Sequence, residues 1–142
     1  MSGLVIPETV VQQLWAITQA EYPREACGFL IGDEQGYFGM RQLRNYAPDP
    51  TQEFWMNPLD VEQYVKLYLH VATWHSHPNG LWNLSALDRQ LMIKSQLPMA
   101  VVAPKPYPAV ALYGFKDGQI VMSQRYKVEL IKEAQHELRH SD

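Results

Sequence analysis

The feature that most constrains this chain is a set of polar residues at fixed spacing: His75-x-His77-Pro78, followed by Ser85 and Asp88. Side chains two positions apart on a strand point to the same face, so the two histidines can meet. Asp88, eleven positions after the second histidine, adds a carboxylate. Two imidazoles and one carboxylate leave a fourth zinc position open, which is typical of catalytic rather than structural zinc. The sequence therefore predicts one zinc ion per chain, bound by His75, His77 and Asp88.

Apolar periodicity and turn residues indicate a mixed α/β chain. Helices are expected at about 7–21, at 58–70 and from Ser85 onward, and strands at 26–32, 37–44, 71–75, 99–103, 109–115 and 119–124. A polar helix or tail is expected at about 126–142. Elements in this order favour an α+β fold with a central mixed sheet and helices packed on its faces.

Several finer expectations follow from residue type. Pro7 suits a first helical position. Asn57 suits an N-cap, and Pro58 suits the first helical position after it. His70 is expected at the C-terminus of the second helix, where it can bond the last carbonyls. Leu87, Leu91 and Lys94 of the third helix are expected to face inward or to lie at its edge.

Composition narrows the class of protein. At 142 residues the chain fits a single domain, 1–142. A net charge of -3 gives no global basic field, so neither nucleic acid nor a membrane is expected as a partner. The only cysteine, Cys27, cannot form an internal disulfide, and no stretch approaches the roughly 18 apolar residues of a membrane span. These features predict a cytoplasmic protein, with a phage particle as the other setting.

The motif residues also have plainer interpretations. Ser85-x-x-Asp88 is a capping box, in which Ser85 can cap the third helix and still turn its hydroxyl toward a reacting carbonyl. Glu25, taken alone, is most simply a solvated carboxylate at a strand end. Cys27 sits in an apolar strand, which favours a buried thiol over a catalytic one.

A second zinc-binding pattern occurs near the C-terminus. His136-Glu137-Leu138-Arg139-His140 matches the H-E-x-x-H pattern of the zincins. Only Ser141 and Asp142 follow it, so no third ligand lies downstream, and the segment is polar. We interpret it as a surface helix.

Taken together, the motif resembles that of the JAMM/MPN+ metalloproteases, the zinc-dependent deubiquitinase-like isopeptidases. That family has a distant Glu, then His-x-His-Pro, a spacer and Ser-x-x-Asp. The segments 25–30, 54–58 and 100–102 are also similar to the family. The resemblance implies that His75, His77 and Asp88 bind zinc, that Glu25 is the general base, and that Ser85 helps to stabilise the oxyanion. It also implies the family's curved sheet flanked by helices, similar to the cytidine deaminases.

The resemblance leaves the substrate open. Leu84 stands where many prokaryotic members have proline, which places loop shape and substrate choice in question. The implied substrates are peptide or isopeptide bonds in a ubiquitin-like or sulfur-carrier protein, or in a phage tail protein. Trp55 and Trp82 are expected to be exposed and to form a groove for an extended peptide. The alternative is an inactive MPN-type scaffold that serves as an assembly subunit.

Overall fold

The structure is a computed structural model that describes residues 4–129. Three helices and six strands follow one another in these residues: α1 (Glu8–Glu21), β1 (Cys27–Asp33), β2 (Gly36–Leu43), α2 (Pro58–Leu67), β3 (His70–Ser76), α3 (Ala86–Ser95), β4 (Met99–Ala103), β5 (Ala109–Lys116) and β6 (Gln119–Lys127). The predicted α+β fold is confirmed.

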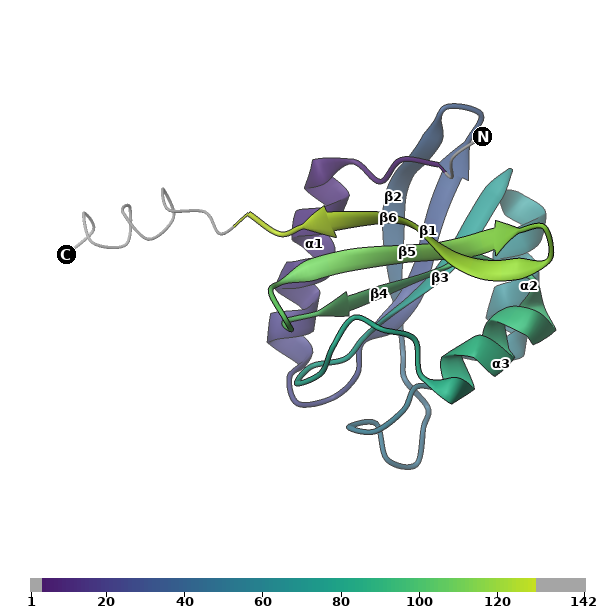
Figure 1. Cartoon of the computed structure of the whole chain (residues 1–142). Coiled ribbons are helices and arrows are strands. Elements are labelled where there is room, and N and C mark those ends of the chain that lie inside the picture. Colours follow the sequence, from purple (N-terminus) through teal and green to yellow (C-terminus); the bar gives the residue numbers. More distant parts are fainter. Residues whose placement is uncertain (1–3, 130–142) are drawn as a thin grey trace, which may run out of the picture.

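The strands form one sheet in the order β2-β1-β3-β4-β5-β6 (Figure 1). β3 and β4 run parallel, and every other neighbouring pair is antiparallel. The parallel pair needs a crossover, because a tight hairpin cannot join parallel strands, and α3 provides it. The motif residues lie where β3 ends and this crossover begins.

Each face of the sheet has its own apolar core. On one face, Val10 and Leu14 of α1 pack with Trp74 and Leu112. On the other face, Met92 of α3 packs in a cluster with Phe54, Trp82 and Val101, and Val61 and Tyr64 of α2 pack against Phe29 and Ile31. Because side chains alternate along β3, Trp74 points into the α1 core while His75 points to the opposite face.

Several boundaries differ from the expectations. Pro7 is the N-cap of α1 rather than its first helical residue. α2 ends at Leu67, and His70 opens β3 opposite Gly32, so the expected helix-end role of His70 is wrong. The partner of His70 in the sheet, Gly32, is distant in sequence, so a local sequence pattern cannot reveal this pairing.

Two further differences concern α3 and the C-terminal segment. α3 buries Asp88 and Met92, whereas Leu87 is 40% exposed and Lys94 is exposed, so the expected inward positions of Leu87 and Lys94 are wrong. β6 continues to Lys127 because it pairs with β5 as far as Ala109, so the expected helix does not begin at 126. The rest of that helix, including the segment 136–140, lies outside the described residues.

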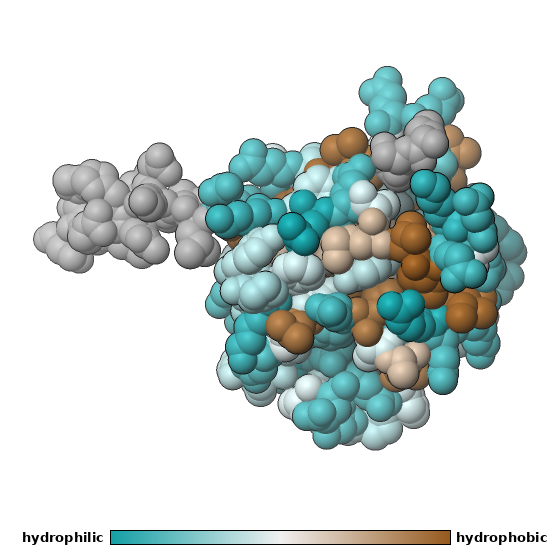
Figure 2. Space-filling view, in the orientation of Figure 1, coloured by the Kyte–Doolittle hydropathy of each residue, from teal (hydrophilic) through white to brown (hydrophobic). Residues whose placement is uncertain are grey.

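A groove of about 910 Å³ opens on the side of the molecule that carries the β5–β6 hairpin. Figure 2 shows hydrophobic side chains gathered on that side. Its lining includes Val65, Leu69, Val121 and Met122. None of the motif residues lines it, so this groove is separate from the candidate site. No helix of the described residues is long and apolar enough to cross a membrane.

Candidate metal centre

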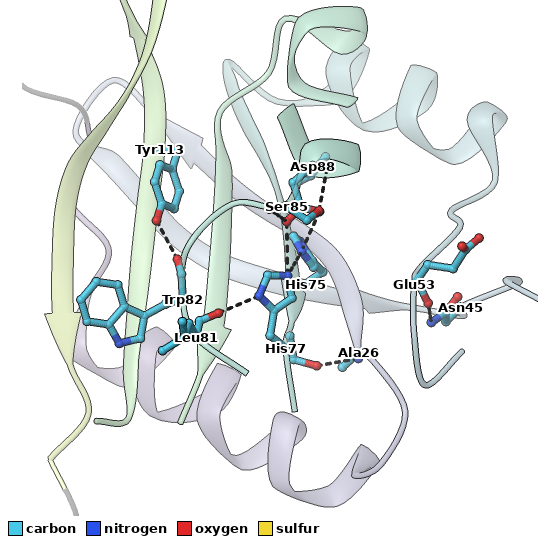
Figure 3. Close-up of polar contacts among 12 residues, drawn as sticks. Ala26, Asn45, Glu53, His75, His77, Leu81, Trp82, Ser85, Asp88 and Tyr113 are labelled. Carbon is cyan, nitrogen blue, oxygen red and sulfur yellow. Dashed lines mark hydrogen bonds and ion pairs between the residues drawn. The ribbon is translucent and has the colours of Figure 1, made fainter. Parts of the chain in front are cut away.

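β3 and the start of α3 bring three groups that could bind a metal to one point (Figure 3). The Nε2 atoms of His75 and His77 lie 3.0 Å apart. Asp88 Oδ1 lies 3.1 Å from Nε2 of His75, and Asp88 Oδ2 lies 3.2 Å from Nε2 of His77. The three residues together could hold a metal ion. The structure thus brings the sequence-predicted donors together.

Asp88 is held by the capping box that its spacing predicts. The backbone N–H of Ser85 donates to Asp88 Oδ2, and the backbone N–H of Asp88 donates to Ser85 Oγ. Each of these hydrogen bonds is 3.0 Å long. The interpretation of this pair as a helix cap is confirmed. Capping and metal binding are compatible, because both carboxylate oxygens of Asp88 also face the histidines.

Burial makes these charges interact strongly. Burial alone would raise the pKa of Asp88, but hydrogen bonds with His75 and His77 outweigh it and hold that pKa well below its usual range. Burial lowers the pKa of His75, which is wholly inaccessible to solvent. Burial also opposes the charge on His77, yet its hydrogen bond with Asp88 raises its pKa overall. The centre is therefore built around an ionised carboxylate and a neutral His75.

The two imidazole rings are oriented by different means. His77 Nδ1 lies 2.8 Å from the carbonyl oxygen of Leu81, and only a protonated Nδ1 can donate to it. In the neutral imidazole, a proton at Nδ1 puts the lone pair on Nε2, which is the form of His77 that binds a metal. His75 stacks on Phe54, with ring centroids 4.3 Å apart, whereas its Nδ1 has no partner among residues 4–129. Neither Phe54 nor the Leu81 carbonyl was identified as a site feature from sequence, because both contacts depend on the fold.

Ser76, between the two histidines, ties the site to the segment that carries Glu25. Its hydroxyl accepts the N–H of Ala26 at 2.8 Å, and its own N–H donates to the Ala26 carbonyl at 2.9 Å. Asn45 also holds the segment that carries Glu25, since its amide donates to the carbonyls of Glu25 and Glu53. Sequence reasoning missed this role of Ser76, for which the sequence offers no signal beyond its position in the motif.

Glu25 lies just before β1 and is 8% exposed, so its interpretation as a solvated carboxylate is wrong. Burial raises its pKa to about 7, while nearby His77 opposes this rise and Asp88 adds to it. The carboxyl group is thus within electrostatic range of two of the candidate ligands. A carboxyl group with a pKa near neutrality can both take up and release a proton at physiological pH.

Cys27 plays no part in this chemistry. Its side chain is inaccessible, and burial raises the pKa of the thiol to about 12. A thiol with such a pKa is protonated at neutral pH and is a poor nucleophile. The prediction of a buried cysteine is confirmed.

Trp82 is not the exposed groove residue that the sequence suggested. It is 9% exposed, whereas Trp55 is 50% exposed, so the expected pair does not form. The Trp82 indole N–H donates to the Tyr107 carbonyl at 3.1 Å. The Tyr113 hydroxyl donates to the Trp82 carbonyl at 2.6 Å, as Figure 3 shows. Trp82 therefore anchors its loop. The residue before it, Leu81, provides the carbonyl that orients His77.

Replacing Trp82 by alanine is expected to lower the free energy of unfolding by about 3 kcal/mol, because a buried indole leaves a cavity. Metal affinity should fall about tenfold, since the Leu81 carbonyl loses its support. Trp55→Ala is the matched control and should change stability by less than ~1 kcal/mol. Urea unfolding and metal titration of both variants measure these effects. Equal stability of the two variants would contradict the burial of Trp82.

The chain is similar in sequence to known proteins. The model of the family described as prokaryotic homologs of the JAB domain matches residues 7–113. Tail tip assembly protein K of Escherichia phage N15 is 31% identical over 98 residues, which are 68% of this chain and 39% of that protein. The chain therefore spans well under half the length of this curated relative.

A solved structure shares the fold. The solution structure of a protein from Desulfitobacterium hafniense superimposes with a TM-score of 0.66 at 23% identity, covering 82% of this chain and 86% of that one. At this identity the likeness concerns the fold alone.

Proposed function

This chain belongs to the family of prokaryotic JAB-domain homologs, and we propose that it is a zinc-dependent peptidase or isopeptidase of that family. One observation carries the proposal: three groups that could bind a metal converge at one point, and a buried carboxyl group interacts electrostatically with two of them. The ligand groups are His75, His77 and Asp88, and the carboxyl group belongs to Glu25. A metal with a proton-transfer group at its side is the minimum that metal-assisted hydrolysis requires.

The donor set fits zinc. In a tetrahedral zinc site with bonds of about 2.0–2.1 Å, neighbouring ligand atoms lie roughly 3.3–3.4 Å apart. The separations among the two Nε2 atoms and the Asp88 oxygens, 3.0 to 3.2 Å, are close to that value. Three protein ligands of the His/His/Asp type are also the number that a catalytic zinc site uses. These residues would hold the ion.

A bound zinc ion would supply Lewis-acid polarisation of the scissile carbonyl and a water of lowered pKa. Glu25 would take up a proton at its carboxylate and return it to the departing amine. Ser85 would donate a hydrogen bond to the oxyanion: its Oγ already accepts the Asp88 N–H, and within residues 4–129 its hydroxyl proton has no acceptor. His77 would remain fixed by its Nδ1–H bond to Leu81.

The substrate that we propose is a protein of a phage tail tip. The support is the similarity to tail tip assembly protein K of Escherichia phage N15, which is 31% identical over 98 residues. A ubiquitin-like or sulfur-carrier protein is the other substrate class consistent with an isopeptidase of this family. Cleavage of one class but not of the other would decide between them.

Purification without chelator is expected to yield about one zinc per chain and hydrolysis of peptide substrates that stops with 1,10-phenanthroline and returns with added zinc. Elemental analysis and mass-spectrometric profiling of a peptide library measure the two properties. A protein that neither contains nor takes up zinc would instead be the inactive MPN-type scaffold. Zinc binding without any cleavage of the library or of tail proteins would refute the peptidase activity.

A further inference from the structure

β6 presents two cations on the same face of the sheet as the metal donors. Tyr126 and Val128 pack with the α1 core, so the alternating residues Arg125 and Lys127 face the other side. The Arg125 guanidinium lies 4.8 Å from the centre of the Trp82 ring and 5.7 Å from that of Tyr107. The Lys127 ammonium lies 5.6 Å from the Tyr107 ring.

The strand register places Arg125 in line with the metal centre. His75 pairs with Val101, Val101 with Ala111, and Ala111 with Arg125, across four adjacent strands. Neighbouring strands are about 4.8 Å apart, so the backbones of His75 and Arg125 are separated by roughly 14 Å. That distance corresponds to about four residues of an extended peptide.

Arg125 is pre-positioned, and it has no anionic partner among residues 4–129. Trp82 beneath it is held by hydrogen bonds to Tyr107, Lys105 and Tyr113. Within residues 4–129, the Arg125 side chain makes neither a salt bridge nor a hydrogen bond, and it is exposed. A guanidinium stacked on a fixed ring loses little freedom when it binds an anion, and its planar fork matches a carboxylate.

We propose that Arg125, supported by Trp82 and Tyr107, is a carboxylate-binding subsite for the substrate. The inference rests on the proposed peptidase function and adds a specificity: a carboxylate about three to four residues from the bond that is cleaved. The carboxylate comes from an acidic side chain or from a free C-terminus. Lys127 adds a second positive charge at the same platform, whereas the chain as a whole has a net charge of -3.

The test is a binding measurement on zinc-free protein, so it does not depend on catalysis. Three pentapeptides are titrated: Ac-Ala-Ala-Glu-Ala-Ala-NH₂, its Gln counterpart, and Ac-Ala₅ with a free carboxylate. The readouts are the NMR signals of the Arg125 Nε–H and the Trp82 indole N–H. Both signals should shift with the Glu peptide or the free C-terminus, and the peptide that binds more tightly identifies the source. Arg125→Gln should weaken that binding at least about tenfold.

Arg41→Gln is the matched control, because Arg41 is an exposed arginine on β2, the opposite edge strand. It should leave the affinity unchanged. Equal shifts with the Glu and Gln peptides, or full binding by Arg125→Gln, would overturn the subsite. Displacement of the Glu peptide by micromolar duplex DNA would overturn it in favour of a nucleic-acid contact.

The binding result and the peptidase activity can fail separately. Selective binding of the carboxylate without any hydrolysis supports the subsite and counts against the proposed function. Zinc-dependent hydrolysis of Glu and Gln peptides at equal rates, together with equal binding, supports the function and removes the subsite.

Discussion

Asp88→Ala is expected to abolish stoichiometric zinc binding and to destabilise the fold at neutral pH. The variant removes one of three ligands, so the loss of affinity should exceed the 10–100-fold effect typical of a residue that only supports a ligand. It also leaves the Ser85 N–H without its carboxylate partner and removes the anion between two histidines. We expect a loss of about 1–3 kcal/mol in the free energy of unfolding of the zinc-free protein at pH 7.

The pH dependence of this loss has a definite sign. The pKa of Asp88 is depressed in the folded protein, so its stabilising effect is present above the ordinary pKa of 3.8 and is lost as the pH falls. The difference in stability between wild type and Asp88→Ala should therefore persist from pH 7 to about pH 4 and shrink only as the pH falls below 3.8. Urea unfolding at several pH values in the presence of EDTA measures it.

Asp60→Ala is the matched control for this variant. Asp60 occupies the third position of α2, as Asp88 does in α3, and is an acidic residue of the first helical turn. It has no histidine partner among the described residues. Asp60→Ala should keep full zinc binding. Loss of zinc in both variants would mean that helix stability, rather than ligation, explains the effect of Asp88→Ala.

The sequence predicts local elements well because their signals are local. Asn57-Pro58 caps α2 as expected, and the spacing of Ser85 and Asp88 forms the expected box at α3. These signals lie within one helical turn. The two histidines meet because β3 is a strand, which the apolar run before them already indicated.

The errors arise where distant segments decide the outcome. Trp82 looks exposed in a loop, but backbone bonds to the segment around Lys105 and the Tyr113 hydroxyl bury it. Lys127 looks helical in a polar stretch, but pairing with Ala109 extends β6. No pattern within a few residues of either position contains this information.

The candidate site divides in the same way. The ligand set could be predicted, since three residue types at fixed spacing are informative by themselves. The contacts that orient the two histidines could not be predicted. Leu81 contributes only a backbone carbonyl to His77, and Phe54 contributes only a ring face to His75. Arg125 lies 37 positions after Asp88 in the sequence, and only the register across β4 and β5 places it in line with His75.

Glu25 links the structure to the proposed mechanism most directly, and its pKa makes a test of folding possible. The pKa is raised from 4.5 to about 7 by burial, so the folded protein binds this proton more tightly than the unfolded chain does. The wild type consequently loses stability as the pH rises from about 4.5 to 7. Glutamine, which stays neutral, should make the zinc-free protein more stable than wild type above pH 7 and equally stable below pH 4.5.

Glu25→Gln is expected to keep one zinc per chain and to lower the rate of hydrolysis by about 10²–10⁴, because the amide cannot take up the proton of the attacking water. Zinc content by elemental analysis and cleavage of the best peptide from the library measure the two effects. Above pH 7 the zinc-free variant is expected to be more stable than wild type, so a less stable fold does not account for a loss of activity there.

Glu53→Gln tests whether the effect belongs to Glu25 itself. Glu53 interacts electrostatically with Glu25, and its carbonyl shares the Asn45 amide with that of Glu25, yet its side chain is only partly buried. This variant removes a nearby negative charge and should retain a rate within about threefold of wild type. Equal losses in both variants would point to the local field rather than to proton transfer. Full activity of Glu25→Gln would remove Glu25 from the mechanism, because no neutral amide can act as a base at this position.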